Sequence, residues 1–384
     1  MGSTSCRVVV GALFWFALIS AAAEPSPRPD GPPPALPKGA RLAFEEDWSG
    51  GRIDPVKWYA LRKKWGEGNN GVVPENVAIA RDVVDGGKER NVLVCTAHGD
   101  EYDGPVIGLG ARKTRVGGVL VSKAAFASGR FEIVVKVGAK RAYDGGPADP
   151  TRPAGAIPAI WTYGYRYARA GGGSRDDFQK DDPLYNPLMR VGRGGGTCMY
   201  WSELDFPEFG KGGRFERAMY NTFCQNRHHP ELFDVAGYID GAYHTLTTEW
   251  RTRLAPLDGV GDAQVVEHGG FFWVHDRSVA FERYLGNPLK KLGPDRYAVC
   301  SGSEVNHWID GRPVARNTQF VPSMAAQLNL GIWLPDWAGP ARWRTATISF
   351  GTIRVWQYDD QGDVRGILAE RITDSFDERG RPIR

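Results

Sequence analysis

The chain of 384 residues has little net charge, few cysteines and no long amphipathic helical pattern. Its formal net charge is +3, from 48 Lys and Arg against 45 Asp and Glu, and acidic residues lie among most of the basic ones. The sequence therefore lacks the basic tract that binds nucleic acid or an anionic membrane surface, and we expect no nucleic-acid partner. It also lacks a long segment with a 3.6-residue apolar period, which argues against a helical fold.

Only the N-terminus carries a strongly apolar stretch. Arg7 precedes the apolar run 8–19, and residues 21–23 are small alanines of the kind found where a signal peptidase cuts. The run is shorter than the roughly 20 apolar residues of a transmembrane helix. We predict that residues 1–23 are a signal peptide, with an uncleaved anchor as the alternative. The mature chain is then secreted or periplasmic and has no membrane span.

The few cysteines do not suggest a metal or redox site. Loss of the signal peptide would leave Cys95, Cys198, Cys224 and Cys300. Their spacing fits neither a zinc site nor a redox pair. If residues 210–213 turn a hairpin, Cys198 and Cys224 fall nearly opposite each other, and a cross-strand disulfide between them is a hypothesis.

What the sequence does contain is typical of an all-β protein. Phe131, Ile133, Val135 and Val137 alternate with other residues in the period of two that marks a half-buried strand. Similar short strands are predicted at 92–97, 116–122, 157–163, 199–209, 214–223, 243–250, 305–309, 325–333 and 345–358. Gly, Pro, Asp and Asn cluster between them. Many short strands with turn signals predict a two-sheet β-sandwich.

The composition also predicts where this domain begins and ends. Residues 24–38 contain seven prolines and are predicted to be a semi-extended linker outside the core. The β-sandwich is expected over 39–358, and the charged tail 359–384 is expected to form a short helix or to fray. Three stretches are long for loops: 138–155, 166–197 and 251–302. The last is expected to form an extra hairpin or lobe.

Three acidic residues in the segment W-S-E-L-D-F-P-E-F are the candidate site. Glu203 and Asp205 are two residues apart and share a face of a strand. Glu208 would face the opposite side of a regular strand, but one extra residue in a β-bulge returns it to the same face. Pro207 lacks an N–H and is tolerated in a bulge. The alternative is a solvated strand face with cross-strand salt bridges.

Paired carboxyl groups on one face suit the hydrolysis of glycosidic bonds. A retaining glycosidase places its two carboxyl groups about 5–5.5 Å apart, one to attack the anomeric carbon and one to protonate the leaving oxygen. Two Glu side chains that lean together from positions 203 and 208 are compatible with that reaction, and the aspartate between them can hydrogen-bond the nucleophile.

The pattern Glu-x-Asp-x-x-Glu resembles the active-site motif, in its bulged form, of glycoside hydrolase family 16, the laminarinase, agarase and carrageenase group. Further similar segments occur in the family's order, over roughly residues 42–358. They are F-E-E-D-W at 44–48, G-R-F-E at 129–132, P-A-I-W at 158–161, D-G-A-Y-H at 240–244 followed by E-W at 249–250, W-I-D-G at 308–311 and I-R-V-W-Q at 353–357.

This resemblance implies a two-sheet, concanavalin-like jelly roll with an open catalytic cleft, and endo-type cleavage of a polysaccharide with retention. By position, Glu203 is the nucleophile, Asp205 its helper and Glu208 the general acid/base. The long insert 251–302 departs from the family, so the resemblance does not name the substrate.

Further residues are expected to bind substrate on the same basis. Trp161 would line the cleft floor, unless it is a core residue, and Trp201 lies two residues before the nucleophile. Asn221, on the next strand, is a candidate sugar-binding group. Relatives often bind a structural calcium through an aspartate where this chain has Gly351, so no metal or cofactor is predicted.

The sequence thus predicts a secreted, monomeric, retaining endo-β-glycanase. Its substrate would be a β-1,3- or mixed-linkage glucan or an algal galactan. A sulfated chain is favoured if Arg112, Arg115, Arg190 and Arg193 line the cleft. A transglycosylase with the same residues and a non-catalytic glycan-binding sandwich are the alternatives. The second has no need of the acid pair.

Overall fold

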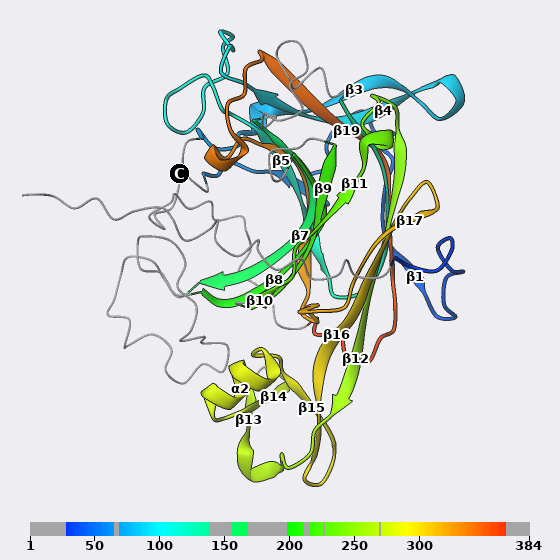
Figure 1. Cartoon of the computed structure of the whole chain (residues 1–384), viewed down its shortest axis with the longest axis vertical. Coiled ribbons are helices and arrows are strands. Elements are labelled where there is room, and N and C mark those ends of the chain that lie inside the picture. Colours follow the sequence, from blue (N-terminus) through cyan, green and yellow to red (C-terminus); the bar gives the residue numbers. More distant parts are fainter. Residues whose placement is uncertain are drawn as a thin grey trace, which may run out of the picture.

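The computed structural model describes residues 28–64, 69–138, 155–167, 198–210, 216–225, 227–268 and 270–365. The fold is a β-sandwich whose strands form two sheets with antiparallel pairing (Figure 1). The predicted signal peptide and two of the three long loops fall outside the described residues. None of the helices in the described part of the chain is long and apolar enough to cross a membrane.

The larger sheet has eleven strands among the described residues and forms one layer of the sandwich. Its order is β13-β14-β15-β16-β12-β6-β19-β4-β3, with β1 paired to β19 and β17 to β16. The strands are β1 (Arg41–Glu46), β3 (Val77–Val84), β4 (Lys88–His98), β6 (Gly129–Val137), β12 (His244–Pro256), β13 (Val265–His268), β14 (Phe271–Val274), β15 (Leu289–Gly293), β16 (Arg296–Ile309), β17 (Arg312–Asn317) and β19 (Thr345–Gln357).

The smaller sheet has eight strands in the described ranges and forms the other layer. Its order is β10-β9-β8-β7-β18-β5-β2, with β11 paired to β9. The strands are β2 (Trp58–Ala60), β5 (Gly118–Phe126), β7 (Ile157–Tyr167), β8 (Cys198–Phe209), β9 (Arg217–Cys224), β10 (Arg227–His228), β11 (Glu231–Asp234) and β18 (Ala326–Trp333). The strands predicted from apolar alternation are all present, and the predicted sandwich is confirmed.

The hydrophobic core fills the space between the two sheets. The alternating residues of β6, from Phe131 to Val137, are at most 2% exposed and face it. From the smaller sheet the core receives Leu120, Ile160, Leu328 and Leu330, each fully buried. These residues lie at every second position of their strands, so the opposite side of the smaller sheet is its outer face.

Within the described residues, helical structure is confined to short segments. The 3₁₀ turns are η1 (Pro74–Asn76), η2 (Asp85–Gly87), η4 (Ala236–Tyr238), η5 (Asp262–Gln264) and η6 (Asp336–Ala338). The helix α2 (Arg277–Tyr284) begins at Asp276, whose side chain caps the N–H of Val279, and ends at Leu285 in the left-handed region. Such caps satisfy the free backbone groups at helix ends.

The insert at 251–302 forms a lobe at one end of the sandwich (Figure 1). β12 and β16 extend past the other strands, and β13, β14, α2 and β15 continue from them. The lobe has a small apolar core of its own, built around Val260, Val274, Leu289, Tyr297 and Val299. We refer to residues 257–295 as the insert lobe.

Both ends of the described chain are fastened to the larger sheet. The described part of the proline-rich segment, residues 28–38, contacts this sheet. The carbonyl of Gly31 accepts a hydrogen bond from Trp308 Nε1 at 2.9 Å. The carbonyl of Pro34 accepts one from Arg130 Nη2 at 2.6 Å. Both donors belong to buried residues, so this part of the predicted linker covers polar groups of the sheet.

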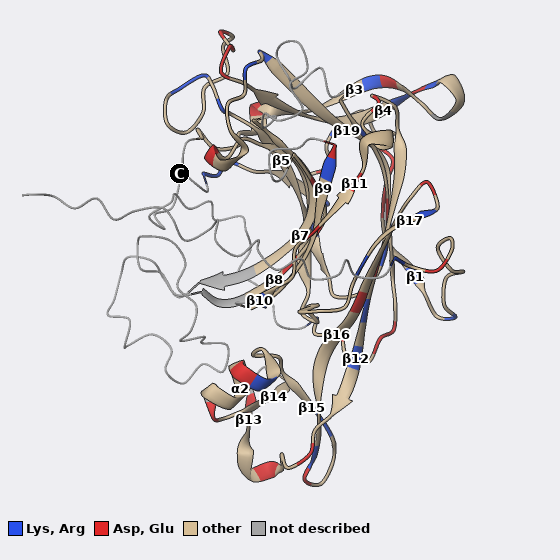
Figure 2. Cartoon of the chain, viewed as in Figure 1, with Lys and Arg blue, Asp and Glu red and all other residues tan. Residues whose placement is uncertain are grey.

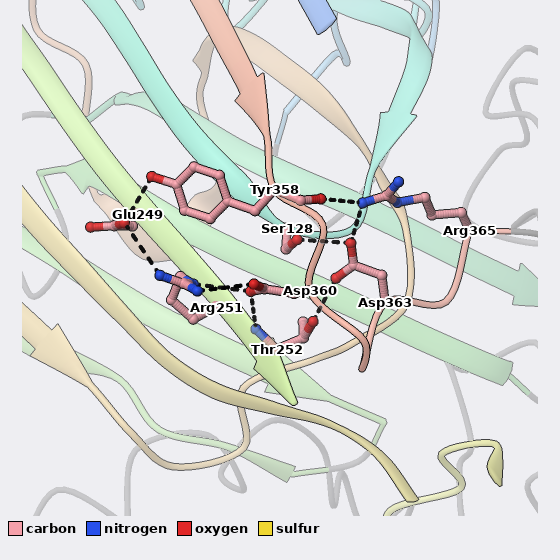
Figure 3. Close-up of polar contacts among 8 residues, drawn as sticks. All are labelled: Ser128, Glu249, Arg251, Thr252, Tyr358, Asp360, Asp363 and Arg365. Atoms are coloured by element: carbon pink, nitrogen blue, oxygen red, sulfur yellow. Dashed lines mark hydrogen bonds and ion pairs between the residues drawn. The ribbon is translucent and has the colours of Figure 1, made fainter. Parts of the chain in front are cut away.

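The segment after β19 is neither a helix nor frayed within the described residues. Asp363 is buried and accepts hydrogen bonds from Ser128 Oγ at 2.8 Å and Thr252 Oγ1 at 2.5 Å, and it pairs with Arg365 (Figure 3). Burial raises the pKa of Asp363. The prediction of a helical or frayed tail therefore does not hold for residues 359–365, whose charged groups have buried partners, and residues 366–384 lie outside the described residues.

A second acidic residue extends this C-terminal clasp, by which we mean residues 358–365. Asp360 accepts from Arg251 Nε at 3.0 Å and Nη2 at 2.9 Å, and from the backbone N–H of Thr252 at 3.0 Å. Tyr358 donates its hydroxyl to Glu249 Oε1 at 2.7 Å. The clasp therefore joins the end of β19 to β12 through charged hydrogen bonds (Figure 3).

Charged residues elsewhere are interspersed by sign over the ribbon (Figure 2). This distribution agrees with the small net charge of +3.

The clasp predicts a loss of stability when Asp363 is removed. Asp363→Ala leaves the hydroxyls of Ser128 and Thr252 without their acceptor and is expected to lower the free energy of unfolding by about 1–3 kcal/mol. Urea denaturation of the purified protein measures this. The matched control is Asp359→Ala, because Asp359 is an exposed neighbour. Equal stability of the two variants would contradict the structural role of Asp363.

A buried histidine predicts how stability depends on pH. His307 is 2% exposed, and burial lowers its pKa from 6.5 to about 3. Between these values the unfolded chain binds more protons than the native one, so stability falls as the pH falls, by at most about 1.4 kcal/mol per pH unit from this group. Urea denaturation from pH 7 to pH 4 should give a shallower pH slope for His307→Gln. Parallel slopes in the two proteins would rule the effect out.

Candidate active site

The faces of β8 are fixed by its apolar residues. Those that enter the core between the sheets are Leu204, Phe206 and Phe209, each at most 2% exposed. Glu203 and Asp205 alternate with them and therefore face outward. Glu208 precedes Phe209 and faces outward as well. All three acidic residues lie on the outer face of the smaller sheet.

The predicted bulge is present between Asp205 and Glu208. On β9 their cross-strand partners are Asn221 and Met219, so three steps on β8 match two on its neighbour. The pairing with β7 shifts over the same residues. The peptide bond before Pro207, within the bulge, is cis. The extra residue brings Glu208 to the face that carries the other two acids.

The three acids differ in exposure. Asp205 is 2% exposed and Glu208 is 7% exposed, whereas Glu203 is half-buried. Glu203 is thus the most accessible of the three, as a group that meets a ligand directly needs to be. Asp205 lies between the other two along the strand, deeper in the sheet surface.

The two neighbouring strands place polar and aromatic residues beside the acids. On β7, Trp161 lies directly across from Asp205 and Tyr163 across from Glu203. Both rings are half-buried and pack on the apolar cluster of Val119 and Val121. Because these valines alternate with core residues of β5, the cluster covers the outer face, and Trp161 is not a residue of the core between the sheets.

Asn221 lies on the other side of Asp205, on β9. It is 3% exposed, and its Oδ1 has no hydrogen-bond partner in the described part of the chain. A buried acceptor without a partner is costly. An unmet acceptor next to the three acids is a natural place for a ligand hydroxyl.

Trp201 contacts Glu203 directly. Its indole Nε1 donates a hydrogen bond to Glu203 Oε2 at 2.6 Å. The sequence predicted a substrate-binding role for this residue from its shared face alone, and the structure adds a contact with the carboxylate itself.

Sequence reasoning missed the aromatic residues that surround Glu203. Tyr163 and Phe223 are its cross-strand partners on β7 and β9. Each lies two positions after a residue that was singled out, Trp161 or Asn221. The period of two that identified the acids was therefore the signal that could have found them.

The proposed disulfide between Cys198 and Cys224 is wrong. Cys224 lies across from Ser202, four residues beyond Cys198 and about 13 Å along the strand. A disulfide needs Cα atoms within about 7 Å. Cys224 is a free, buried thiol that donates to Asn287 Oδ1 at 3.6 Å, and burial raises its pKa to about 12.

Several further polar residues have partners of their own. His228 stacks on Phe223, whereas His229 Nε2 lies 2.9 Å from Glu231 Oε1, so the adjacent histidines serve different neighbours. Arg115 binds Asp100 at 2.9 Å. No group of three or more His, Cys, Asp or Glu in the described ranges has the arrangement of a metal site.

The chain matches no family model and no curated protein. Among solved structures it is similar to a prokaryotic β-1,3-1,4-glucanase (lichenase) derived from a mouse hindgut metagenome, with 15% identity, a TM-score of 0.43 and coverage of 81% of this chain and 97% of that one. It is also similar to a Bacillus licheniformis β-glucanase, with 13% identity, a TM-score of 0.43 and coverage of 83% and 98%.

A third similar structure is the laminarinase catalytic domain from Thermotoga maritima, with 13% identity, a TM-score of 0.45 and coverage of 84% and 99%. With TM-scores below 0.5, these likenesses carry no argument about the family of this chain. At this identity they leave the function to be argued from the side chains of the site.

Proposed function

We propose that the protein is a retaining endo-β-glycanase that cleaves a β-linked polysaccharide by double displacement. The observation that carries the proposal is the presence of Glu203, Asp205 and Glu208 on one outer sheet face, with the bulge between the last two. A carboxylate pair of this kind is what retaining glycosidases require. Trp161 and Asn221 flank the middle acid and supply sugar-binding chemistry.

The proposed reaction divides the work between the two outer acids. In the first step Glu203 attacks the anomeric carbon, the glycosidic C–O bond breaks, and Glu208 gives its proton to the leaving oxygen. In the second step Glu208 takes a proton from water, which attacks the anomeric carbon, and Glu203 leaves with its electron pair. Asp205 stays beside both acids.

Most described polar groups that this face places beside the acids are uncharged, and one ammonium, that of Lys63, lies 5.9 Å from the ring centre of Tyr163. The polar groups of this face include the amides of Asn221, Gln327 and Asn329, which share the face with the aromatic rings. Arg115 was a candidate for sulfate binding but is engaged by Asp100 and by the carbonyl of Gly339. We therefore propose a β-1,3- or mixed-linkage glucan before a sulfated galactan.

Secretion or periplasmic export completes the proposal. It rests on the apolar run near Arg7 and the small residues that follow it. A polysaccharide too large to enter a cell must be met outside the cytoplasm, which suits an exported enzyme. Monomeric action is proposed because the acids, Trp161 and Asn221 all belong to one sheet of one chain.

The division of roles predicts different behaviour of the two acid variants. Glu208→Ala is expected to lower kcat on laminarin or mixed-linkage glucan by about 10²–10⁴-fold, and Glu203→Ala by at least as much. With an activated aryl glycoside, azide should rescue both. The acid/base variant should give a glycosyl azide of retained configuration, and the nucleophile variant one of inverted configuration.

Proton NMR of the azide products distinguishes the two configurations. Asp234→Asn, an exposed acid of β11 in the same sheet, serves as the control and should keep full activity. Polysaccharide cleavage that survives Glu203→Ala would refute the assigned nucleophile. Glycan retention without cleavage in the wild-type protein would favour a binding module instead.

The unmet acceptor of Asn221 predicts a loss of binding without a comparable loss of stability. Asn221→Ala should raise KM for the glucan several-fold, about what one neutral hydrogen bond contributes. Asn317→Ala is the matched control, since Asn317 is also buried with a partnerless Oδ1 among the described residues but lies on β17. Isothermal titration of the two variants with an oligosaccharide would show the difference, and equal affinities would count against Asn221.

A further inference from the structure

The contact between Trp201 and Glu203 is a short hydrogen bond to an acid that is proposed to react. The indole Nε1 lies 2.6 Å from Glu203 Oε2. A hydrogen bond to a carboxylate favours its ionised form and is stronger than one between neutral groups. It also fixes the position of one of the two carboxylate oxygens.

The indole ring is held by other rings and is not a free platform for a sugar. Phe223 stacks on it with centroids 5.4 Å apart and planes 16° apart. His228 stacks on Phe223 at 4.9 Å and 5°. Tyr163 packs at right angles to Trp201, at 5.8 Å. One face of the indole is thus covered by Phe223, and the polar edge of the ring is directed to Glu203.

The backbone of Trp201 pairs with Tyr165 of β7 on one side and is held by Gln225 on the other. The N–H of Gln225 donates to the carbonyl of Trp201 at 2.8 Å, and the N–H of Trp201 donates to Gln225 Oε1 at 3.3 Å. Gln225 is 1% exposed and has a φ of 59°. Its side chain therefore reaches back to β8 from a tight turn at the end of β9.

The insert lobe packs against this same turn. A Cβ on Gly286 would lie 2.9 Å from Gln225 Nε2, so the loop after α2 passes directly over the amide. Asn287 Oδ1 accepts from the thiol of Cys224, the residue before Gln225. The insert lobe thus contacts the turn at Gln225, and this turn contacts β8 at Trp201.

We propose that Trp201 is a positioning residue for Glu203 and that Gln225, supported by the insert lobe, holds Trp201 in place. The inference rests on the proposed glycanase function and deepens it. In the first step the N–H holds Oε2 while the Glu203 carboxylate attacks the anomeric carbon, the glycosidic C–O bond breaks, and Glu208 gives its proton to the leaving oxygen. In the second step the bond between Glu203 and the anomeric carbon breaks, its electron pair returns to the carboxylate, and the N–H stabilises the returning charge.

Two variants separate the parts of this arrangement. Trp201→Phe keeps a ring for packing but removes the N–H. Gln225→Asn shortens the side chain and keeps a residue that tolerates a positive φ. Trp201→Phe should lower kcat by about 10–100-fold, as expected for loss of a hydrogen bond to a charged group, with KM nearly unchanged. The acid limb of the kcat/KM profile should move to higher pH.

Gln225→Asn should also lower kcat and move the acid limb of the kcat/KM profile to higher pH, each by less than Trp201→Phe does. The double variant should be no worse than Trp201→Phe alone, because Gln225 acts through the indole. Trp201→His, which keeps a ring N–H, should recover part of the lost kcat. Trp356→Phe is the matched control, since this half-buried tryptophan lies on β19 of the larger sheet. It should leave both kcat and the acid limb unchanged.

A second readout does not depend on activity. In protein labelled with ¹³C at glutamate carboxyls, the Glu203 signal is assigned with Glu203→Gln and titrated by NMR. Its midpoint should lie at higher pH in Trp201→Phe than in the wild type. An unchanged midpoint together with an unchanged kcat would overturn the positioning role. A raised KM in Trp201→Ala with wild-type behaviour in Trp201→Phe would overturn it in favour of sugar stacking.

The remaining outcomes separate the two proposals. If the wild-type protein cleaves no glycan but the Glu203 midpoint still lies at higher pH in Trp201→Phe, the contact between Trp201 and Glu203 stands and the glycanase function is refuted. If Trp201→Phe does not fold, as thermal unfolding would reveal, Gln225→Asn still tests the proposal through the same titration. Additive losses in the double variant would exclude Gln225 as a support of the indole.

Discussion

The site depends on one property of extended backbone, the alternation of side chains between the two faces of a strand. β8 must keep Leu204, Phe206 and Phe209 in the core and three acids outside it. The spacing of Phe206 and Phe209 is three residues, which regular alternation does not allow. The bulge adds one residue to β8 without a partner on β9. After this residue the alternation starts again, so that Phe209 faces the core and Glu208 faces outward. Without the bulge, Glu208 would face a core that cannot accept an unpaired charge.

The register of β8 is in turn maintained by side chains that reach it from distant parts of the chain. Thr162 Oγ1 accepts from the N–H of Leu204, and Ser202 Oγ donates to the carbonyl of Met324. Met324 also forms a β-bridge with Val364 of the C-terminal clasp. A charged network on the larger sheet is therefore connected, through backbone pairing, to the strand that carries the acids.

The sequence was sufficient wherever the signal was periodic. The predicted strands and the sandwich follow from short apolar segments such as Phe131 to Val137, and the bulge follows from the spacing of Glu203, Asp205 and Glu208 around Pro207. It was insufficient where a contact depends on which distant residues meet. Cross-strand register decides which aromatic rings pack beside Trp201 and whether the thiol of Cys224 meets another cysteine. The contacts of the charged C-terminal segment likewise depend on which distant residues lie next to it. Register is set by the whole sheet, and a shift of one residue exchanges the faces.

The outer face of the smaller sheet carries an apolar cluster that a sandwich does not need for its own stability. Val119 and Val121 are fully buried there beneath half-buried aromatic rings, on the side of the sheet away from the core. An antiparallel sheet usually presents polar residues on its second face. Apolar surface rimmed by polar groups marks a place where something binds. A sugar ring, with apolar C–H faces and hydroxyls at its edge, matches rings such as Trp161 beside the amide of Asn221. The same side of the sheet that holds the acids therefore has the chemistry to hold a glycan against them.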